Sequence, residues 1–130
     1  MSDDATPGVL VIDDDPTIRL LLTAGLGRQG FRVTSVEDGP AGLTAFARER
    51  PDLVLVDVSM PGMDGYAVVT GLRAMPQGES LPVLMLTAAD DAETRRLAAD
   101  AGATDVITKP FQLLPLAERL RQLLVQGGSC

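Results

Sequence analysis

Five short apolar segments recur at regular intervals, and their spacing constrains the fold of this chain more than any other feature. They lie at residues 8–12, 31–36, 53–56, 82–86 and 105–108. The first, third and fourth are almost continuously apolar, as strands covered on both faces of a parallel sheet are. The second alternates apolar and polar residues, which is typical of an edge strand. We therefore expect five strands.

Amphipathic stretches separate these segments. They lie at residues 16–29, 40–48, 64–74, 91–101 and 114–126. Five strands alternating with five helices predict an α/β, doubly wound fold with a parallel sheet. A length of 130 residues is typical of a single domain. We assign it to residues 8–126, with residues 1–7 as a flexible N-terminal tail and 127–130 as a linker or chain end.

The turn residues agree with these helices. Asp15 before Pro16 predicts the start of the first helix. The glycines expected to end helices are Gly30, Gly102, Gly127 and Gly128. In the first helix we expect an apolar group on or near one face, made of Ile18, Leu21, Leu22, Ala24 and Leu26. In the last helix we expect a buried stripe, made of Leu116, Leu120, Leu123 and Leu124. Residues 25–30 match GxGxxG, but they close a helix instead of opening one, so we interpret them as a helix end.

Composition excludes several functions. The chain has no histidine, so it contains no Ser-His-Asp triad and no histidine-ligated metal. Its net charge of −7 and its low aromatic content argue against direct nucleic-acid binding. Cys130 is the single cysteine, so no internal disulfide forms. There is no long apolar run and the first residues are acidic, so we expect no signal peptide, no membrane segment and a cytoplasmic location.

Polar residues gather where the predicted strands end. Asp13 and Asp14 follow the first strand, Asp57 the third and Thr87 the fourth, while Lys109, the only lysine, follows the fifth. In an open parallel sheet, ligands bind beyond the carboxyl ends of the strands. Each residue alone would be read as a cap, a turn or a surface group. Together they predict one site with three carboxylates, a hydroxyl and an ammonium.

These groups favour a particular chemistry. Three close carboxylates without histidine or cysteine ligands suit Mg²⁺. A carboxylate beside that cation is a nucleophile toward phosphorus. The oxygens of a transferred phosphoryl group need neutralising, and Lys109 and the Thr87 hydroxyl are placed to contribute. The site therefore predicts the formation and hydrolysis of an aspartyl phosphate.

Four segments carry a family resemblance. They are VLVIDDDP (9–16), PDLVLVDVSMPGMDG (51–65), PVLMLTA (82–88) and GATDVITKPF (102–111). In this order and spacing they resemble a response-regulator receiver domain of bacterial two-component signalling over residues 8–126. The resemblance implies a flavodoxin-like (βα)5 fold with strand order 2-1-3-4-5.

The resemblance also implies roles for the site residues. Asp57 would accept a phosphoryl group from the phosphohistidine of a sensor histidine kinase or phosphotransfer protein. Asp13, Asp14 and Asp57, with the backbone carbonyl of Ser59, would hold Mg²⁺. Thr87 would move to bond the phosphoryl oxygen, and Lys109 would pair with the phosphoryl group. The peptide bond between Lys109 and Pro110 is expected to be cis.

Two departures from the family pattern concern signalling. Many receivers carry Tyr or Phe three residues before the lysine, where this chain has Val106. We therefore expect the response to run through displacement of residues 88–96. Ser59 and Ala89, which flank the phosphate position, are small and uncharged. They would set water access to the phosphoryl group.

The expected output surface is built from residues 91–101, 105–108 and 114–126. Its expected exposed arginines are Arg95, Arg96, Arg119 and Arg121. This surface would control an output domain or a partner protein. Among the expected partners is also a second copy of the chain, in a phosphorylation-dependent dimer. The chain would act only on its own aspartate and not as an enzyme on other substrates.

Three alternatives remain open. An aspartate-nucleophile phosphatase usually has a second aspartate two residues after the first, where this chain has Ser59. A flavin or nucleotide carrier needs neutral or donor-rich phosphate loops, whereas the first loop here reads Asp-Asp-Asp. A degenerate receiver acting only as a scaffold would not need all five site residues.

Overall fold

The computed structural model describes residues 6–89 and 91–128, and within these ranges five strands alternate with five helices. The strands are β1 (Gly8–Ile12), β2 (Arg32–Val36), β3 (Leu53–Asp57), β4 (Val83–Thr87) and β5 (Asp105–Thr108). The helices are α1 (Pro16–Arg28), α2 (Gly39–Glu49), α3 (Gly65–Arg73), α4 (Ala92–Ala101) and α5 (Leu113–Gly128). The expected alternation of strands and helices is confirmed.

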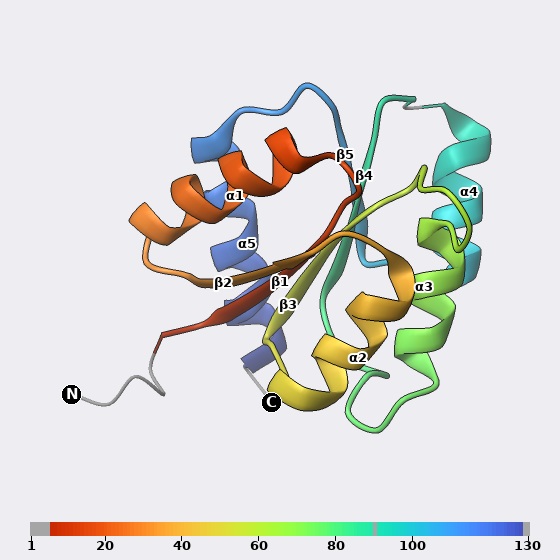
Figure 1. Cartoon of the computed structure of the whole chain (residues 1–130), viewed down its shortest axis with the longest axis horizontal. Helices are drawn as coiled ribbons and strands as arrows, with labels where there is room; N and C mark the ends of the chain where they lie inside the picture. The colour runs from red at the N-terminus through yellow and green to blue at the C-terminus, as the bar shows by residue number, and fades with distance from the viewer. Residues whose placement is uncertain (1–5, 90, 129–130) are drawn as a thin grey trace.

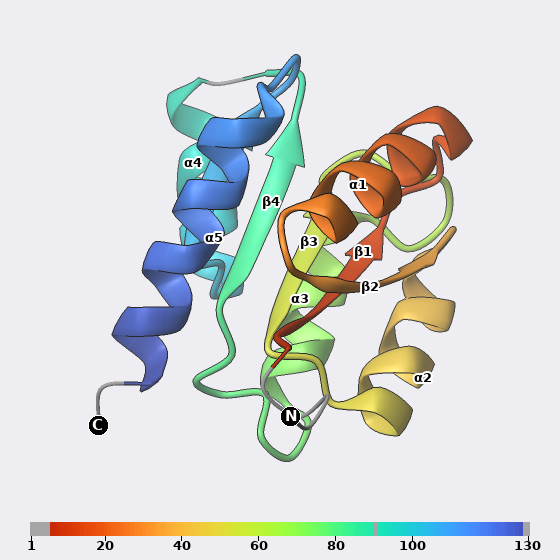
Figure 2. The same ribbon diagram turned by 90° about the vertical axis from the view of Figure 1, so that its left-hand side faces the viewer.

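The strands form one parallel sheet in the order β2-β1-β3-β4-β5, as the resemblance implied. In Figure 1, α1 and α5 lie on the left of the sheet and α2, α3 and α4 on the right; Figure 2 shows the same layers from the side. The chain runs from β1 outward to the edge strand β2. It then crosses back over β1 to β3 and continues through β4 to β5. The strand order therefore reverses at β1 and β3, where Asp13 and Asp57 lie.

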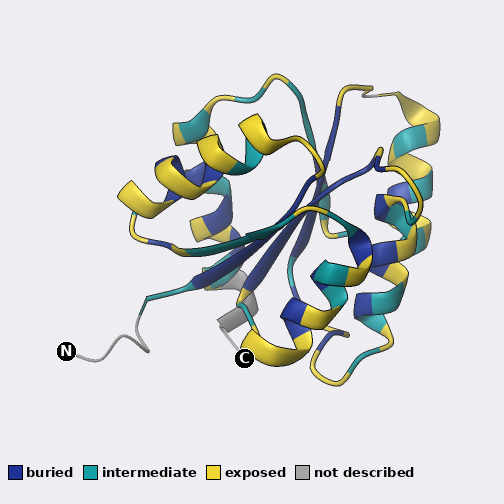
Figure 3. Ribbon diagram, in the orientation of Figure 1, coloured by how far each residue is buried: buried dark blue, intermediate teal, exposed yellow. Residues whose placement is uncertain are grey.

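Continuous burial explains the apolar runs of the central strands. Every residue of β1, β3 and β4 is buried, and Figure 3 shows this dark core between helices with exposed outer faces. Alternate side chains enter opposite cores: Leu10 and Ile12 pack toward α2 and α3, whereas Val9 and Val11 pack toward α1 and α5. The outer strand β2 is mostly half-buried, which confirms it as an edge strand.

The buried stripe of α1 is narrower than the sequence pattern predicts. Leu22 and Leu26 are buried, but Leu21 is 48% exposed and Ala24 is also exposed, so only part of the expected apolar face enters the core. At Gly25 the helix packs closely against α5, because an added Cβ would lie 2.5 Å from the Leu113 side chain. The helix therefore approaches α5 along its Leu22–Leu26 face, and its neighbouring positions point outward. In α5 the stripe is confirmed, because Leu116, Leu120 and Leu123 are buried and Leu124 is partly buried.

Aspartates begin four of the helices. Asp15, Asp38, Asp64 and Asp91 each accept a hydrogen bond from a backbone N–H of the first turn. Such caps stabilise a helix by about 1 kcal/mol. Four of the 18 acidic residues therefore have a structural role as helix caps.

Glycines end two helices as expected. Gly30 follows α1 with φ 96° and Gly102 caps α4 with φ 105°, so GxGxxG is confirmed as a helix end. Gly127 and Gly128 were expected to follow the last helix, but α5 continues through both. Glycine permits a left-handed turn without requiring one, so it does not oblige a helix to stop.

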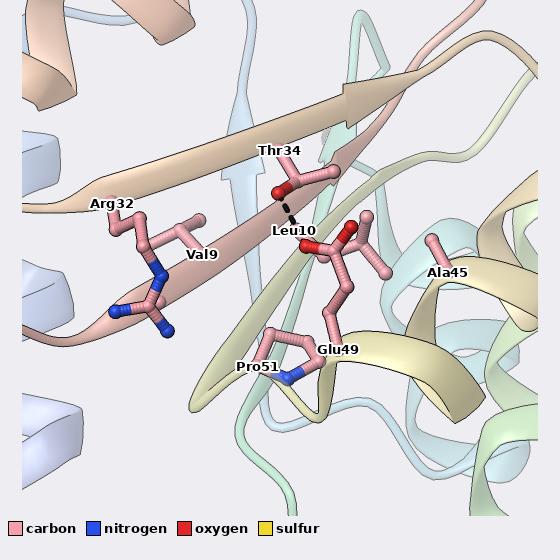
Figure 4. A pocket seen from close by; sticks show the side chains of 8 residues that line it. Val9, Leu10, Arg32, Thr34, Ala45, Glu49 and Pro51 are labelled. Carbon is pink, nitrogen blue, oxygen red and sulfur yellow. Dashed lines mark hydrogen bonds between the residues drawn. The ribbon is translucent and has the colours of Figure 1, made fainter. Parts of the chain in front are cut away.

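A small pocket lies at the amino ends of the strands, on the side opposite to the predicted site (Figure 4). Its lining includes Thr34 of β2 and Glu49 of α2, and the Thr34 hydroxyl donates to Glu49 Oε1 at 2.7 Å. Its volume of about 10 Å³ accommodates at most one water molecule. It is therefore too small for an organic ligand. Among the described helices, none combines the length and apolar character needed to cross a bilayer.

Candidate functional site

The carboxyl ends of the strands bring the predicted site residues together. Asp13 follows β1 directly, Asp57 ends β3, Thr87 ends β4 and Lys109 follows β5. One carboxylate oxygen from each of Asp13, Asp14 and Asp57 lies within 4.8 Å of the others. The five residues singled out in the sequence therefore lie at one edge of the sheet.

Asp13 is held by hydrogen bonds at each of its polar groups. Its backbone N–H donates to Val36 O at 3.2 Å, and its carbonyl accepts from Arg19 Nη1 at 2.7 Å. Its Oδ1 accepts from the Asp15 N–H at 2.9 Å, and its Oδ2 accepts from Lys109 Nζ at 3.2 Å. The side chain is completely buried. Asp13 is thus a fixed carboxylate whose position is set from four directions.

Lys109 lies between the two buried carboxylates. Its Nζ is 3.2 Å from Asp13 Oδ2 and 3.2 Å from Asp57 Oδ1. Burial by itself would lower the pKa of Lys109, but the charges of Asp13 and Asp57 outweigh it and raise that pKa. Lys109 therefore stays protonated at neutral pH and partly balances both carboxylates.

Burial acts on the pKa of Asp57 in the direction opposite to its action on Lys109. Removal from water raises the pKa of Asp57, and repulsion from Asp13 raises it further, while Lys109 and the Ser59 backbone N–H act against this. Two buried carboxylates share one ammonium, and the exposed carboxylate of Asp14 adds a third negative charge. The site therefore has an excess of negative charge.

The donor set fits a divalent cation of the magnesium type. All three side-chain donors are carboxylate oxygens, which Mg²⁺ prefers. A cation there would relieve the repulsion that raises the pKa of Asp57. Ser59 is exposed beside Asp57, and its predicted contribution of a backbone carbonyl stays a prediction.

The Thr87 hydroxyl is engaged within the turn that leads to α4. It accepts from the Ala89 N–H at 3.0 Å and donates to Ala89 O at 3.1 Å. Thr87 is also only 5% exposed. To bond a group on Asp57, this hydroxyl would have to leave Ala89, so Thr87 connects the site mechanically to residues 88 and 89.

The segment after β5 is tied to the end of β4. The Lys109 backbone N–H donates to Thr87 O at 2.7 Å. The peptide bond between Lys109 and Pro110 is cis, as expected from the resemblance. The two strand ends that carry the hydroxyl and the ammonium are therefore joined directly.

Gly65 allows the loop after β3 to fold back against the site. Its N–H donates to Val58 O at 2.9 Å, and an added Cβ would lie 2.2 Å from the Asp57 carbonyl oxygen. We expect G65A to lower the free energy of unfolding by about 1–3 kcal/mol, because backbone must move to admit the methyl group. Urea denaturation measures this loss.

The matched control for that prediction is G27A. Gly27 lies in α1 and an added Cβ there meets nothing within 4 Å. Alanine at a helix interior should therefore stabilise by about 0.5–1 kcal/mol. Equal effects of G65A and G27A on unfolding would contradict the assigned close approach.

The expected output surface is only partly as predicted. Arg95 and Arg96 are exposed on α4, but Arg119 is partly buried and pairs with Asp105 at 2.9 Å. Arg121 does not belong to this surface, because its Nη2 donates to Gln29 Oε1 at 2.9 Å, beside α1. Residues two apart on a helix point to nearly opposite sides, so Arg119 and Arg121 do not share a face.

Sequence reasoning missed Arg19. It occupies the fourth position of α1, near a helix N-terminus where the macrodipole disfavours a cation. This unfavourable placement is the feature of the sequence that could have indicated a specific role for Arg19. Its bond to the Asp13 carbonyl attaches α1 to the site.

Comparison with known proteins agrees with the geometry. The family model described as "Response regulator receiver domain" matches residues 9–121. The chain is 40% identical over 124 residues to the transcriptional regulatory protein PrrA of Mycobacterium tuberculosis, covering 95% of this chain and 52% of PrrA. The chain thus spans about half the length of this relative.

Solved structures give the same result. The chemotaxis protein CheY4 of Vibrio cholerae superposes with a TM-score of 0.89 at 32% identity, covering 92% of this chain and 99% of CheY4. The receiver domain of the sensor histidine kinase PA1611 of Pseudomonas aeruginosa superposes with a TM-score of 0.85 at 32% identity, covering 92% of this chain and 98% of that domain. That structure holds a magnesium ion in its active-site cleft.

Proposed function

Because this chain belongs to the response regulator receiver domain family, we propose that it is a phosphorylation-dependent switch in two-component signalling. Asp57 accepts a phosphoryl group from the phosphohistidine of a sensor histidine kinase or phosphotransfer protein. The observation that carries this proposal is Lys109, placed 3.2 Å from both Asp57 and Asp13 in an otherwise acidic site.

The transfer follows from the positions of the side chains. An Asp57 carboxylate oxygen forms a bond to phosphorus as the bond from phosphorus to the donor's imidazole nitrogen breaks, and the electron pair of that bond stays on nitrogen. Lys109, already at Asp57 Oδ1, turns toward an oxygen of the incoming group. The donor histidine belongs to the partner, since this chain has none.

Asp13 and Asp14, with Asp57 and the Ser59 carbonyl, would hold Mg²⁺ at this site. When bound, Mg²⁺ supplies positive charge that neutralises phosphoryl oxygens. Support comes from the close grouping of the three aspartates and from the magnesium ion in the PA1611 receiver. Asp13 is rigid and Asp14 exposed, so the site combines a fixed ligand with an accessible one.

The phosphoryl group would report its presence through Thr87. Its hydroxyl leaves Ala89 to bond a phosphoryl oxygen, and this releases the hydrogen bonds that shape residues 88 and 89. Val106 is buried in β5, and its aliphatic side chain has no aromatic ring that could turn inward. The displacement therefore passes to residues 88–96 and on to the surface formed by α4, β5 and α5.

We expect T87A to accept the phosphoryl group but lose the response in residues 88–96. Alanine removes the bond to the phosphoryl oxygen and leaves Asp57 and Lys109 in place. Backbone amide shifts measured by NMR with beryllofluoride and Mg²⁺ should shrink several-fold in that segment. T87S keeps the hydroxyl and is the control; equal shifts in T87A and wild type would contradict the role of Thr87.

The output belongs to another domain or protein. PrrA is a transcriptional regulatory protein, and this chain matches about half of its length. The net charge of −7 argues against direct DNA binding, so we assign regulation to an output domain or partner protein, with a phosphorylation-dependent dimer as one form of it. We infer that the switch acts in the cytoplasm, without a membrane partner.

The proposal is tested with acetyl phosphate. Wild-type protein in Mg²⁺ should gain the mass of one phosphoryl group by intact mass spectrometry, and it should gain little when EDTA removes the cation. Decay of the adduct in buffer should regenerate the original mass without turnover of p-nitrophenyl phosphate, because the chain acts only on its own aspartate. Absence of any adduct in Mg²⁺ would overturn the proposal.

A further inference from the structure

We propose that Arg19 is a positioning residue for the divalent cation, acting by fixing the peptide plane between Asp13 and Asp14. This inference rests on the proposed function, since it concerns the same cation site. The juxtaposition that carries it is one bond, from Arg19 Nη1 to the Asp13 carbonyl oxygen at 2.7 Å. A short bond from a guanidinium is stronger than a neutral one.

That carbonyl belongs to the peptide unit that connects Asp13 to Asp14. The N–H and both carboxylate oxygens of Asp13 are held by β2, by Asp15 and by Lys109. Of these four bonds, only the one at the carbonyl comes from the side chain of a residue in α1. The orientation of the peptide plane, and with it the direction in which Asp14 leaves the backbone, therefore depends on Arg19.

Asp14 needs such support because its own side chain is exposed. Within the described part of the chain, no neighbouring group donates to its carboxylate. Asp15, on the other side, is fixed as the cap of α1 through its bond from the Thr17 N–H at 2.9 Å. The Arg19 backbone N–H also donates to Asp15 O at 3.1 Å. Asp14 thus lies between two residues that α1 holds in place, and Arg19 contributes to both contacts.

The position of Arg19 is unfavourable on other grounds. A cation near the N-terminus of a helix opposes the macrodipole. A guanidinium beside the cation site also repels Mg²⁺. The charge of Arg19 should weaken Mg²⁺ binding, whereas its bond to the Asp13 carbonyl should strengthen it. Replacing Arg19 therefore raises or lowers the Mg²⁺ affinity according to which effect dominates.

The test compares Mg²⁺ binding by isothermal titration calorimetry in wild type, R19M and R19K. If Arg19 acted only through its charge, R19M would bind Mg²⁺ more tightly. If Arg19 aims Asp14, R19M should bind about tenfold more weakly, as is typical when a group that orients a ligand is removed. R19K keeps the charge but not the planar fork, so its affinity should lie between those of wild type and R19M.

The matched control is R96M. Arg96 is exposed on α4 and pairs with the exposed Asp100 at 3.4 Å. R96M changes the net charge as R19M does, but Arg96 does not contact the cation site. R96M should therefore bind Mg²⁺ as wild type does. Urea denaturation reports whether each variant remains folded, and R19K provides the comparison if R19M proves too unstable to titrate.

The outcomes separate this inference from the proposed function. Tighter or unchanged Mg²⁺ binding in R19M, or wild-type affinity in R19K where R19M does not fold, overturns the role of Arg19. In that case wild type would still bind Mg²⁺ and accept phosphate, so the proposed function would stand. Failure of wild type to bind Mg²⁺ would contradict the proposed function itself.

Discussion

Replacing Asp57 with asparagine should abolish the phosphoryl adduct formed with acetyl phosphate and Mg²⁺. The amide lacks the anionic oxygen that attacks phosphorus, and it removes one of the three carboxylates that face the cation. The expected loss is complete within the detection limit of intact mass spectrometry. Asp13 does not replace Asp57, because its carboxylate is fully buried and paired with Lys109.

The matched control for this variant is D64N. Asp64 is an exposed aspartate in the loop after β3, and its side chain caps α3 by accepting from the Ala67 N–H at 2.9 Å. Asparagine caps a helix about as well, so the fold should be unchanged. D64N should gain the phosphoryl mass as wild type does. An adduct of equal yield in D57N would show that another residue is the acceptor.

Replacing Asp57 with asparagine should also stabilise the metal-free protein. Burial, followed by repulsion from Asp13, raises the pKa of Asp57 above its usual 3.8. The folded state therefore prefers the protonated form, and stability falls as the pH rises from 3.8 through the raised pKa. Asparagine removes this ionisation, so D57N should unfold at higher urea concentration than wild type at neutral pH. The advantage should shrink toward low pH.

The fold and most of the site could be predicted because burial and topology leave direct traces in the sequence. A strand covered on both faces reads as an apolar run, and β1, β3 and β4 are fully buried. The residues that end such runs must lie at one edge of a parallel sheet. Asp57 and Lys109 therefore could be placed together although they are far apart in the chain.

Features set by packing between helices could not be predicted. Leu21 is exposed although Gly25, one turn further along the same face of α1, packs closely against Leu113 of α5. Arg121 turns toward Gln29, since the side of α5 that meets α1 is fixed by tertiary contacts. Sequence periodicity gives a stripe of positions but not its width.

Arg19 escaped prediction for a different reason. Its partner is a backbone carbonyl, and every residue has one. A bond to a backbone group leaves no complementary residue type in the sequence, unlike the pairing of Lys109 with two aspartates. Contacts of this kind emerge only when the turn between β1 and α1 has its three-dimensional shape.

Replacing Lys109 with alanine should lower the stability of the metal-free protein by about 3 kcal/mol at neutral pH. Its removal leaves Asp13 and Asp57 as neighbouring buried carboxylates without a countercharge, and breaking a buried ion pair costs about 3–5 kcal/mol. The lower end applies because the Lys109 side chain is 21% exposed. Urea denaturation in EDTA measures the loss.

The pH dependence of this loss has a defined sign. Although burial opposes it, the two carboxylates raise the pKa of Lys109 above the usual 10.5. The stabilisation by Lys109 is therefore complete below 10.5 and disappears as the pH rises through the higher folded-state pKa. The difference between wild type and K109A should accordingly be constant around neutral pH.

Combining K109A with D57N separates the charge of Lys109 from its packing. Mg²⁺ that binds the remaining carboxylates of K109A should raise the free energy of unfolding by about 2.7 kcal/mol when its concentration is a hundred times the dissociation constant. In the double variant K109A/D57N the repulsion between the two buried carboxylates is gone, so K109A should cost clearly less in that background than in wild type. If Lys109 acted mainly by packing its aliphatic stem, K109A would cost the same in both backgrounds. Equal costs would therefore refute the assignment of Lys109 as the countercharge of the site.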